Sequence, residues 1–535
     1  MEKEAIKGSQ IDFVRLGFAL LFIVAVLIYS FSTTGSVPNN AFLSIAALFG
    51  AYMAMNIGAN DVANNVGPAV GSKALTMGGA IAIAAIFEAA GAFIAGGDVV
   101  KTIKKGIIDI AMFGDNTNEF IWAMMAALLA AALWLNFATY IKAPVSTTHS
   151  IVGGVMGAGI AAAGFSIVAW GTMGKIAASW IISPVLGGVI AAGFLLAIKK
   201  TMVSKEDKIK ASIKWVPVFV ALMSWAFVTY LTLKGLKKVW PSIVSFLTFL
   251  PEAKKPSFMI AALFGLAIAI IVYLIVKASI SKKASRIENT REGINSLFTV
   301  PLIFAAALLS FAHGANDVAN AIGPLAAIND AVMNGGISSE AGIPLWVIGV
   351  GALGIAVGLA LYGPKLIRTV GSEITELDQM RAFSVAMAAS ITVIIASQMG
   401  LPVSSTHIAV GGIFGVGFLR EYLDSTDTQD GIEKKQEEIV DEKKQLRALN
   451  AELDALQNQD KKEKVDYERI VNLFRLIDEE EHALKVSKKE LKNVRKKKYV
   501  KRDAVKKIIA AWIITVPAAA TLSALVFFII RGIAV

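Results

Sequence analysis

Eleven apolar runs, each about as long as a membrane-spanning helix, constrain this sequence more than any other feature. They lie near 12–32, 41–58, 78–96, 120–141, 176–198, 216–233, 258–277, 297–312, 344–362, 382–399 and 508–530. A helix needs roughly 20 mostly apolar residues to cross the hydrocarbon core of a bilayer. With 55% hydrophobic residues over the whole chain, there is too little polar surface for a soluble fold. The sequence therefore predicts an all-α protein that crosses a membrane many times.

The net charge of +11 is a signal of topology rather than of nucleic-acid binding, because Lys and Arg lie mainly between the apolar runs and in one polar insertion. The absence of Cys excludes disulfides and thiolate metal sites. No small-residue cleavage site follows the first apolar run, Ile11 to Ser30. We therefore expect a retained helix there and not a removed signal peptide.

Four motif copies indicate that the chain contains two related halves. Residues 58–64, Gly-Ala-Asn-Asp-Val-Ala-Asn, return unchanged at 314–320. Residues 144–149, Pro-Val-Ser-Thr-Thr-His, return as Pro-Val-Ser-Ser-Thr-His at 402–407. Internal duplication of this kind is characteristic of secondary transporters, in which the copies run either parallel or inverted.

Lysine placement predicts the inverted arrangement. Lys-rich segments lie near 199–214, after the first half, and near 277–291, before the second, and the positive-inside rule places both in the cytoplasm. The segment between them, near 234–255, also carries lysines, but fewer, and is then outside. On this orientation the N-terminus is cytoplasmic and the C-terminus lies outside. We predict two inverted-topology repeats with broken or re-entrant helices, preceded by one extra helix.

The same reasoning divides the chain into six parts. In order, they are an extra N-terminal transmembrane helix, transport repeat 1, connecting loops with two transmembrane helices, the first part of transport repeat 2, a charged coiled-coil hairpin, and the last transmembrane helix of repeat 2. Their predicted boundaries are 1–36, 37–199, 200–296, 297–423, 424–506 and 507–535.

The charged part is predicted to form an antiparallel helical hairpin in the cytoplasm, because apolar residues keep coiled-coil spacing on both sides of a polar stretch near 457–462. These residues are Leu446, Leu449, Leu453 and Leu456, followed by Ile470, Ile477, Leu484 and Leu491. A solvated stalk without separate activity and a partner-binding or regulatory module are both compatible with this pattern.

The first motif places polar side chains inside apolar runs. They are Asn60, Asp61 and Asn64 in one half and Asn316, Asp317 and Asn320 in the other. An intramembrane Asp is energetically costly and usually functional, and carboxylate and amide oxygens suit sodium or a proton better than a soft metal. Since Gly, Asn and Pro are poor residues for a helix interior, we also predict interrupted spans from Asn60 to Pro68 and from Asn316 to Pro324. A capping role for the two Asp residues is the alternative, and it is compatible with ion binding.

The second motif supplies hydroxyl groups just after a proline, where a helix would begin. They belong to Ser146, Thr147, Thr148, Ser404, Ser405 and Thr406. Unpaired backbone N–H groups and the helix dipole favour an anion at such a position. If the halves are inverted, the two helix starts face each other near the midplane and surround a tetrahedral oxyanion. The alternative interpretation is that these residues are ordinary caps that pack helices.

Neither motif contains Arg, so a bound anion would need co-bound cations to offset its charge, which favours symport. Three further residues are candidates for coupling: Glu88, His149 and His407. A His titrates near neutral pH and is able to relay a proton, although a packing role is the simpler explanation for both. Glu88 is either an ion ligand or a buried, hydrogen-bonded acid.

The four motif copies resemble the signatures of the inorganic phosphate transporter (PiT) family, and the resemblance covers nearly all of the membrane region. It implies an inverted-repeat fold, phosphate bound by the six hydroxyl residues, and sodium or protons handled through the Asn-Asp motifs. It implies no cofactor besides the transported Na⁺ or H⁺, and its expected partners are inorganic phosphate, sodium ions and membrane lipid, but no nucleic acid. A homodimer remains open. The extra N-terminal helix and the hairpin depart from compact members of the family without interrupting a motif.

The leading hypothesis is therefore import of phosphate by sodium symport across the cell membrane, through alternating access of the two repeats. Proton-coupled uptake of phosphate or of a metal–phosphate complex, and sulfate transport on the same scaffold, are alternatives within this class. A signalling receptor that uses the hairpin and an anion channel are alternatives outside it. The sequence has neither a nucleotide-binding P-loop nor an evident nucleophile–base pair, so an enzyme is not expected.

Overall fold

The computed structural model describes residues 2–35, 37, 40–141, 145–237, 239–247, 253–337, 342–373, 377–459, 463–495, 500 and 502–535. Within these ranges the protein is helical, and its only β-type pairing is an isolated bridge between Ile108 and Val168. Eleven helices among the described residues are long and apolar enough to cross a membrane. The all-α, multi-span fold class predicted from the sequence is therefore confirmed.

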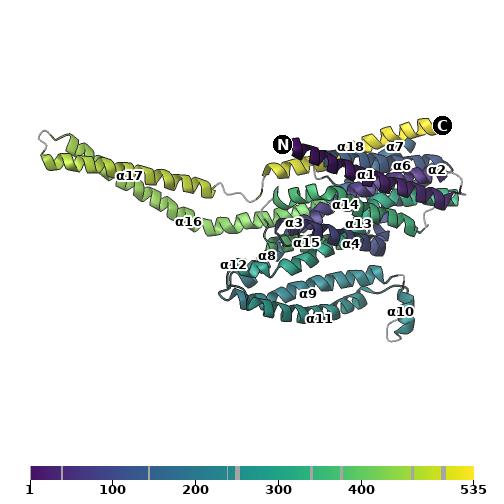
Figure 1. The fold of residues 1–535 in the computed structure, drawn as a ribbon, viewed down its shortest axis with the longest axis horizontal. Coiled ribbons are helices and arrows are strands. Elements are labelled where there is room, and N and C mark those ends of the chain that lie inside the picture. Colours follow the sequence, from purple (N-terminus) through teal and green to yellow (C-terminus); the bar gives the residue numbers. More distant parts are fainter. Residues whose placement is uncertain are drawn as a thin grey trace. The chain divides into compact units, whose positions relative to one another are not determined.

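Figure 1 shows the order of the helices along the chain. The long ones are α1 (Glu2–Thr34), α2 (Asn40–Asn60), α4 (Met77–Ala95), α6 (Thr117–Tyr140), α8 (Trp170–Ile198), α9 (Lys208–Gly235), α11 (Phe258–Ala284), α13 (Thr299–Asn334), α14 (Leu345–Glu373), α15 (Gln379–Gln398), α16 (Ser405–Gln457), α17 (Lys464–Arg495) and α18 (Arg502–Ala534). Shorter helices are α3 (Val62–Gly71), α5 (Gly97–Lys105), α7 (Thr147–Ala163), α10 (Trp240–Phe246) and α12 (Arg291–Ser296).

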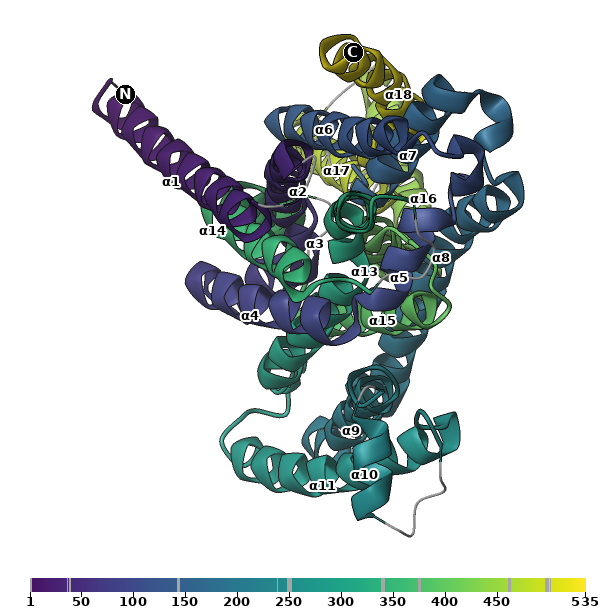
Figure 2. The same ribbon diagram turned by 90° about the vertical axis from the view of Figure 1, so that its right-hand side faces the viewer.

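Helix α13 forms the centre of the membrane region, and Figure 2 shows α2, α4, α6, α7, α14 and α15 around it. In its apolar window 89% of the residues are buried, against 17% for α1 and for α11. Many large apolar side chains of α1 are exposed, including Phe13, Phe18 and Leu21. Since lipid tails are as apolar as these side chains, an outward-facing apolar surface is expected for a peripheral spanning helix.

The prediction that the second Asn-Asp motif interrupts its span is wrong. Helix α13 runs without a break through Asn316, Asp317 and Pro324. In the first half the break is confined to Asp61, which separates α2 from α3, and Pro68 lies inside α3. Intrinsic helix propensity is weak compared with tertiary packing. Since α13 is almost completely buried, its packing outweighs the low helix propensity of these residues.

Glycines in the two Asn-Asp motifs allow two pairs of helices to touch backbone to backbone. A Cβ at Gly58 would lie 1.9 Å from the carbonyl oxygen of Ile355, which fixes the contact of α2 with α14. A Cβ at Gly314 would lie 2.1 Å from the carbonyl oxygen of Glu88, which fixes the contact of α13 with α4. Since Gly58 and Gly314 occupy the same motif position, Ile355 and Glu88 are equivalent residues of the two halves.

The equivalent helices α2 and α13 cross each other in opposite directions. Near one end, a Cβ at Gly50 of α2 would meet the side chain of Leu325 of α13. Near the other end, ligand atoms of Asp61, His313 and Asp317 lie within 4.8 Å of one another. Helices α2 and α13 are therefore antiparallel.

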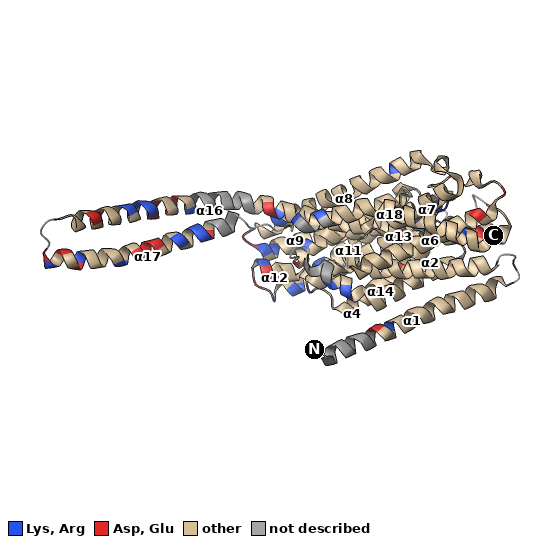
Figure 3. Ribbon diagram, turned by 90° about the horizontal axis from the view of Figure 1, so that it is seen from above, with Lys and Arg blue, Asp and Glu red and all other residues tan. Residues whose placement is uncertain are grey.

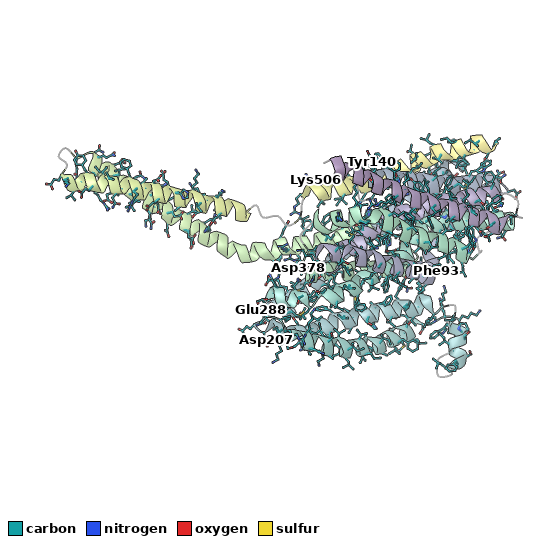
Figure 4. The ribbon with its side chains drawn as sticks, viewed as in Figure 1. Phe93, Tyr140, Asp207, Glu288, Asp378 and Lys506 are labelled. Carbon is teal, nitrogen blue, oxygen red and sulfur yellow. The ribbon has the colours of Figure 1, made fainter. Side chains whose placement is uncertain are left out.

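The lysine-rich turns predicted to be cytoplasmic gather at one end of the helices, where Figure 3 shows Lys and Arg concentrated near α9 and α12. The Asn289 side chain donates to the carbonyl oxygen of Glu206 at 2.8 Å, and Arg291 donates to Asp378 at 2.6 Å. These contacts join the turns that follow α8 and α11 to the start of α15. Figure 4 labels Asp207, Glu288 and Asp378 in this region.

Residues 417–501 form a compact unit separate from the rest of the chain. In it, Lys435 of α16 pairs with Glu490 of α17 at 2.7 Å, and Glu452 of α16 pairs with Arg469 at 2.7 Å. The partner numbers run in opposite order, so the two helices are antiparallel. The eight apolar residues with predicted coiled-coil spacing are all buried or half-buried. Residues 460–462 of the predicted polar stretch lie outside the described residues.

Candidate functional site

The carboxylate of Asp61 joins the two hydroxyl motifs. Thr147, at the start of α7, donates to Asp61 Oδ2 at 2.6 Å. Thr406, at the start of α16, donates to Asp61 Oδ1 at 3.0 Å. Asp61 is 1% exposed and both threonines are completely buried. One acid from the first half thus accepts hydrogen bonds from both halves.

Asp317 repeats part of this arrangement in the second half. Ser405 donates to Asp317 Oδ2 at 2.9 Å, and Ser405 is the motif equivalent of Thr147. The two halves of the chain are also linked by side-chain amides. Asn64 donates to Thr406 Oγ1 at 2.9 Å, and Asn320 donates to Thr148 Oγ1 at 3.1 Å. These last two contacts are equivalent under exchange of the halves, so the site has approximate two-fold symmetry.

The hydroxyl motifs begin helices, as the sequence predicted. Ser146 Oγ accepts from the backbone N–H of His149 at 3.1 Å, which caps α7. Ser404 Oγ accepts from the backbone N–H of His407 at 3.3 Å at the start of α16. The two starts touch, because Thr148 donates to the carbonyl oxygen of Val403 at 2.9 Å. Pro144 of the first motif lies outside the described residues.

The amide nitrogens of the Asn-Asp motifs are used in hydrogen bonds, but their oxygens are not. Asn60 donates to Thr139 Oγ1 at 2.9 Å, and Asn316 donates to Ser397 Oγ at 2.9 Å. The side-chain oxygens that find no hydrogen-bond donor among the described residues are Oδ1 of Asn60, Asn64, Asn316, Asp317 and Asn320. Buried polar atoms are normally satisfied, and a repeated set of acceptor oxygens is chemically suited to an electropositive group.

His313 is a site residue that the sequence analysis missed. Its Nδ1 lies 2.7 Å from Glu88 Oε2, and its Nε2 lies 2.8 Å from Asp317 Oδ2. The far oxygen of Glu88 accepts from Asn65 at 2.8 Å. His313, Glu88 and Asp317 are completely buried. Both ring nitrogens thus lie close to carboxylate oxygens, with hydrogen-bond geometry at Nδ1 and ion-pair distance at Nε2.

The chain formed by Glu88, His313 and Asp317 exists in one half only. At the position of His313, directly before the first Gly-Ala-Asn-Asp, stands Ile57, and the equivalent of Glu88 is Ile355. The signal that could have revealed His313 was this difference between the two copies. The residues that the two copies share do not include His313.

The other two candidate coupling residues, His149 and His407, pack against tryptophans. The His149 ring centroid lies 3.8 Å from that of Trp180, and the His407 ring stacks on Trp512 at 3.6 Å. The two imidazoles themselves are 4.5 Å apart. No ring nitrogen of either His has a hydrogen-bond partner within the described ranges. These contacts brace the two helix starts against each other.

The three carboxyl groups, the His313 imidazole, several hydroxyls and five Asn side chains form one buried cluster. Oxygen atoms dominate it, which is the donor set of hard cations. The hydroxyls and the capped helix starts supply donors for an oxyanion. The arrangement therefore combines in one buried place groups that are chemically suited to a cation and groups that are suited to an anion.

Comparison with known proteins agrees with this chemistry. The pattern of the phosphate transporter family matches residues 57–523. A Helicobacter pylori (strain J99) protein, ascribed a phosphate permease function, is 49% identical over 98% of this chain and 96% of its own length. A Pyrococcus abyssi protein with the same ascribed function is 38% identical over 71% of this chain and 89% of its own.

A solved structure extends the likeness to three dimensions. It is titled as the sodium-dependent phosphate transporter and shares 30% sequence identity with this chain. The match has a TM-score of 0.71 and covers 92% of this chain and all of the other. The family consists of permeases, so an enzymatic role is excluded. With the family pattern spanning most of its length, the chain belongs to the phosphate transporter family.

Proposed function

We propose that this protein imports inorganic phosphate by sodium symport across the cell membrane. The observation that carries this proposal is the set of unpartnered, buried Oδ1 atoms in the two Asn-Asp motifs. Such oxygens are suited to Na⁺, since a cation needs acceptors and no donors. The solved structure titled as a sodium-dependent transporter supports the same coupling ion.

The phosphate is bound by the hydroxyls of Ser146, Thr147, Thr148, Ser404, Ser405 and Thr406, and sodium by Asn60, Asp61, Asn64, Asn316, Asp317 and Asn320. The contacts described above suggest how the two are coupled. A hydroxyl has one proton to donate, and those of Thr147 and Thr406 are donated to Asp61. When Na⁺ binds the Asp61 carboxylate, these hydroxyls are free to turn toward phosphate. Sodium therefore raises phosphate affinity without any long-range movement.

The two halves act as inverted repeats that expose this site alternately to either side. The opposite directions of α2 and α13 support this proposal, as does the exchange symmetry of the Asn64–Thr406 and Asn320–Thr148 contacts. With the lysine-rich turns in the cytoplasm, the N-terminus and the hairpin unit are cytoplasmic and the C-terminus is outside. The six domain boundaries stay predictions. A homodimer is compatible with this proposal but is not part of it.

Uptake of labelled phosphate into proteoliposomes, with sodium and proton gradients imposed separately, tests the coupling ion. We expect uptake that follows the sodium gradient. Asp61→Asn and Asp317→Asn should each abolish it, because each removes a charged cation ligand. Normal sodium-driven uptake by both variants would refute the assignment. Competition with unlabelled sulfate, measured at several pH values, identifies the anion, since phosphate changes protonation near pH 7 and sulfate does not.

Proton coupling is the second candidate, and one observation favours it specifically. The Glu88–His313–Asp317 chain is a continuous set of titratable groups that ends at the candidate cation site. Under this hypothesis, His313→Gln abolishes proton-driven uptake, whereas sodium-driven symport would retain a measurable rate with altered sodium affinity. Uptake that responds only to an imposed proton gradient would decide for this candidate.

A further inference from the structure

A cavity lined mainly by apolar side chains, with three lysines among them, lies away from the buried cluster, between the end of α9, the start of α11 and the end of α15. Its volume is about 870 Å³, and it is open to the surface. Asp98 of α5 also lines it. Figures 1 and 2 both place α10 at this end of the α9–α11 pair. The cavity therefore opens at the end of the helices opposite to the one that carries Asp207 and Glu288.

Three lysines line this cavity: Lys234, Lys237 and Lys255. Lys234 is paired with Asp98. Partial burial alone would raise the pKa of Asp98, but its hydrogen bond with Lys234 and the charges of Lys234 and Lys237 hold that pKa below its usual range. One carboxylate thus offsets one lysine. The positive charges of Lys237 and Lys255 are left to act on the interior of the cavity.

Deeper side chains of the cavity include two that are able to donate a hydrogen bond. Tyr230 is 1% exposed and lines the cavity, and its hydroxyl lies near the side chain of Ser397. The buried Nε2 of Gln398 has no hydrogen-bond partner among the described residues. Both groups are able to donate a hydrogen bond. Leaving a buried polar group unpaired costs about 1–3 kcal/mol. A ligand that accepts hydrogen bonds would remove this cost, whereas an apolar ligand would not.

The cavity adjoins the segment that leads to the second hydroxyl motif. Gln398 and Met399 line it, and Gly400 follows directly, with its carbonyl oxygen accepting from Thr102 at 2.7 Å. The residue before Gln398, Ser397, accepts from Asn316 of the buried site at 2.9 Å. A ligand in the cavity is thus separated from the central cluster by the end of α15.

We propose that this cavity is a vestibule that binds free inorganic phosphate before it reaches the central site, with Lys237 and Lys255 attracting the anion and Tyr230 and Gln398 receiving it. The inference rests on the proposed function, and it adds a second site for the same substrate. It also explains why lysines occupy the segment near 234–255, which the positive-inside rule would leave poor in them. There they concentrate substrate and do not direct insertion.

Transport kinetics of Lys237→Gln/Lys255→Gln test the vestibule. Lys175→Gln/Lys282→Gln is a matched control, since both of its lysines are exposed and lie outside the cavity lining and outside the segment near 234–255. Charged clefts raise substrate capture by roughly 10-fold or more, so we expect the vestibule variant to raise the KM for phosphate about 3-fold to 10-fold with an unchanged maximal rate. The control should keep the native KM.

Ionic strength and Tyr230→Phe provide independent checks. At fixed sodium, added choline chloride should raise the native KM and have less effect on the vestibule variant, because salt screens exposed charges. Tyr230→Phe, which removes a single hydroxyl, should raise KM and keep the native salt dependence. A vestibule variant with native KM and native salt dependence overturns the proposal. If the native protein itself takes up no phosphate, the proposed function fails instead.

The lipid composition of the vesicles separates free phosphate from a lipid headgroup, which presents the same phosphate oxygens. The measurements are made in vesicles of phosphatidylcholine alone and in vesicles that also contain phosphatidylglycerol. For free phosphate, the KM difference between native and vestibule variant persists in phosphatidylcholine alone. A difference confined to vesicles with phosphatidylglycerol assigns the cavity to an anionic lipid and overturns the proposal.

Discussion

Removing both members of the buried Glu88–His313 pair should cost less stability than the two single removals added together. The interacting atoms are 2.7 Å apart, which corresponds to an attraction of ~6 kcal/mol at an effective dielectric constant near 20. Much of this attraction is offset by the cost of burying the two groups. Loss of one partner leaves an uncompensated buried charge, which costs about 3–5 kcal/mol. Glu88→Ile and His313→Ile should therefore each destabilise the protein by that amount.

The double variant restores the apolar pair that the other half already carries at Ile57 and Ile355. It leaves Asn65 without its acceptor, at a cost of about 1–3 kcal/mol, and it leaves Asp61 and Asp317 without the nearby imidazole. We expect a total cost of about 2–4 kcal/mol, well below the sum of the single variants, and hence a coupling energy of at least about 2 kcal/mol.

Unfolding of the purified protein by sodium dodecyl sulfate in mixed micelles, followed by tryptophan fluorescence, measures these free energies. Ile57→Val and Ile355→Val serve as controls for simple loss of packing and should each cost about 0.5–1.5 kcal/mol. If the double variant loses as much stability as the two single variants added together, Glu88 and His313 are not coupled. The electrostatic account of this half would then be wrong.

Three further predictions concern other parts of the fold. Gly58→Ala should cost roughly 1–3 kcal/mol and reduce uptake, because its Cβ would push against the neighbouring backbone, whereas Gly193→Ala, with open space around it, should be neutral in the same unfolding assay. The pKa of Asp98 is lowered by Lys234, so its pairing stabilises the protein above the unfolded-state value near 3.9 and loses this effect as pH falls through the lower folded-state value. The difference in melting temperature between the native protein and Lys234→Met should accordingly be present at pH 7 and shrink below about pH 4. Deletion of 430–505 should leave phosphate uptake unchanged in a correctly inserted protein if the hairpin unit is a stalk, and complete loss of uptake would assign it a role in transport.

Much of the membrane architecture was predictable because it follows from composition and duplication. Apolar runs of spanning length mark the helices whatever their packing partners are. The repeated motifs identified Asp61 and Asp317 because an acid inside an apolar run is rarely there without cause. The same logic indicated Glu88, and the structure places all three acids in one buried cluster. Their roles as ion ligands remain proposals that the uptake experiments address.

Other features depend on tertiary contacts that local patterns do not encode. The continuity of α13 through Pro324 follows from helices that surround it on all sides, and a propensity scale has no access to that environment. His313 was missed because its significance lies in its distance to Glu88, a residue 225 positions away. The vestibule was hidden for the same reason, since Tyr230, Lys255 and Gln398 come from three different helices or loops.

The unequal charge of the two halves has a consequence for the working cycle. If alternating access exchanges the conformations of two repeats, identical repeats would give outward-open and inward-open forms of equal energy. Here Glu88 and His313 in one half correspond to Ile355 and Ile57 in the other. Under the proposed alternating access, this difference would give the empty carrier a preferred orientation set by its own sequence.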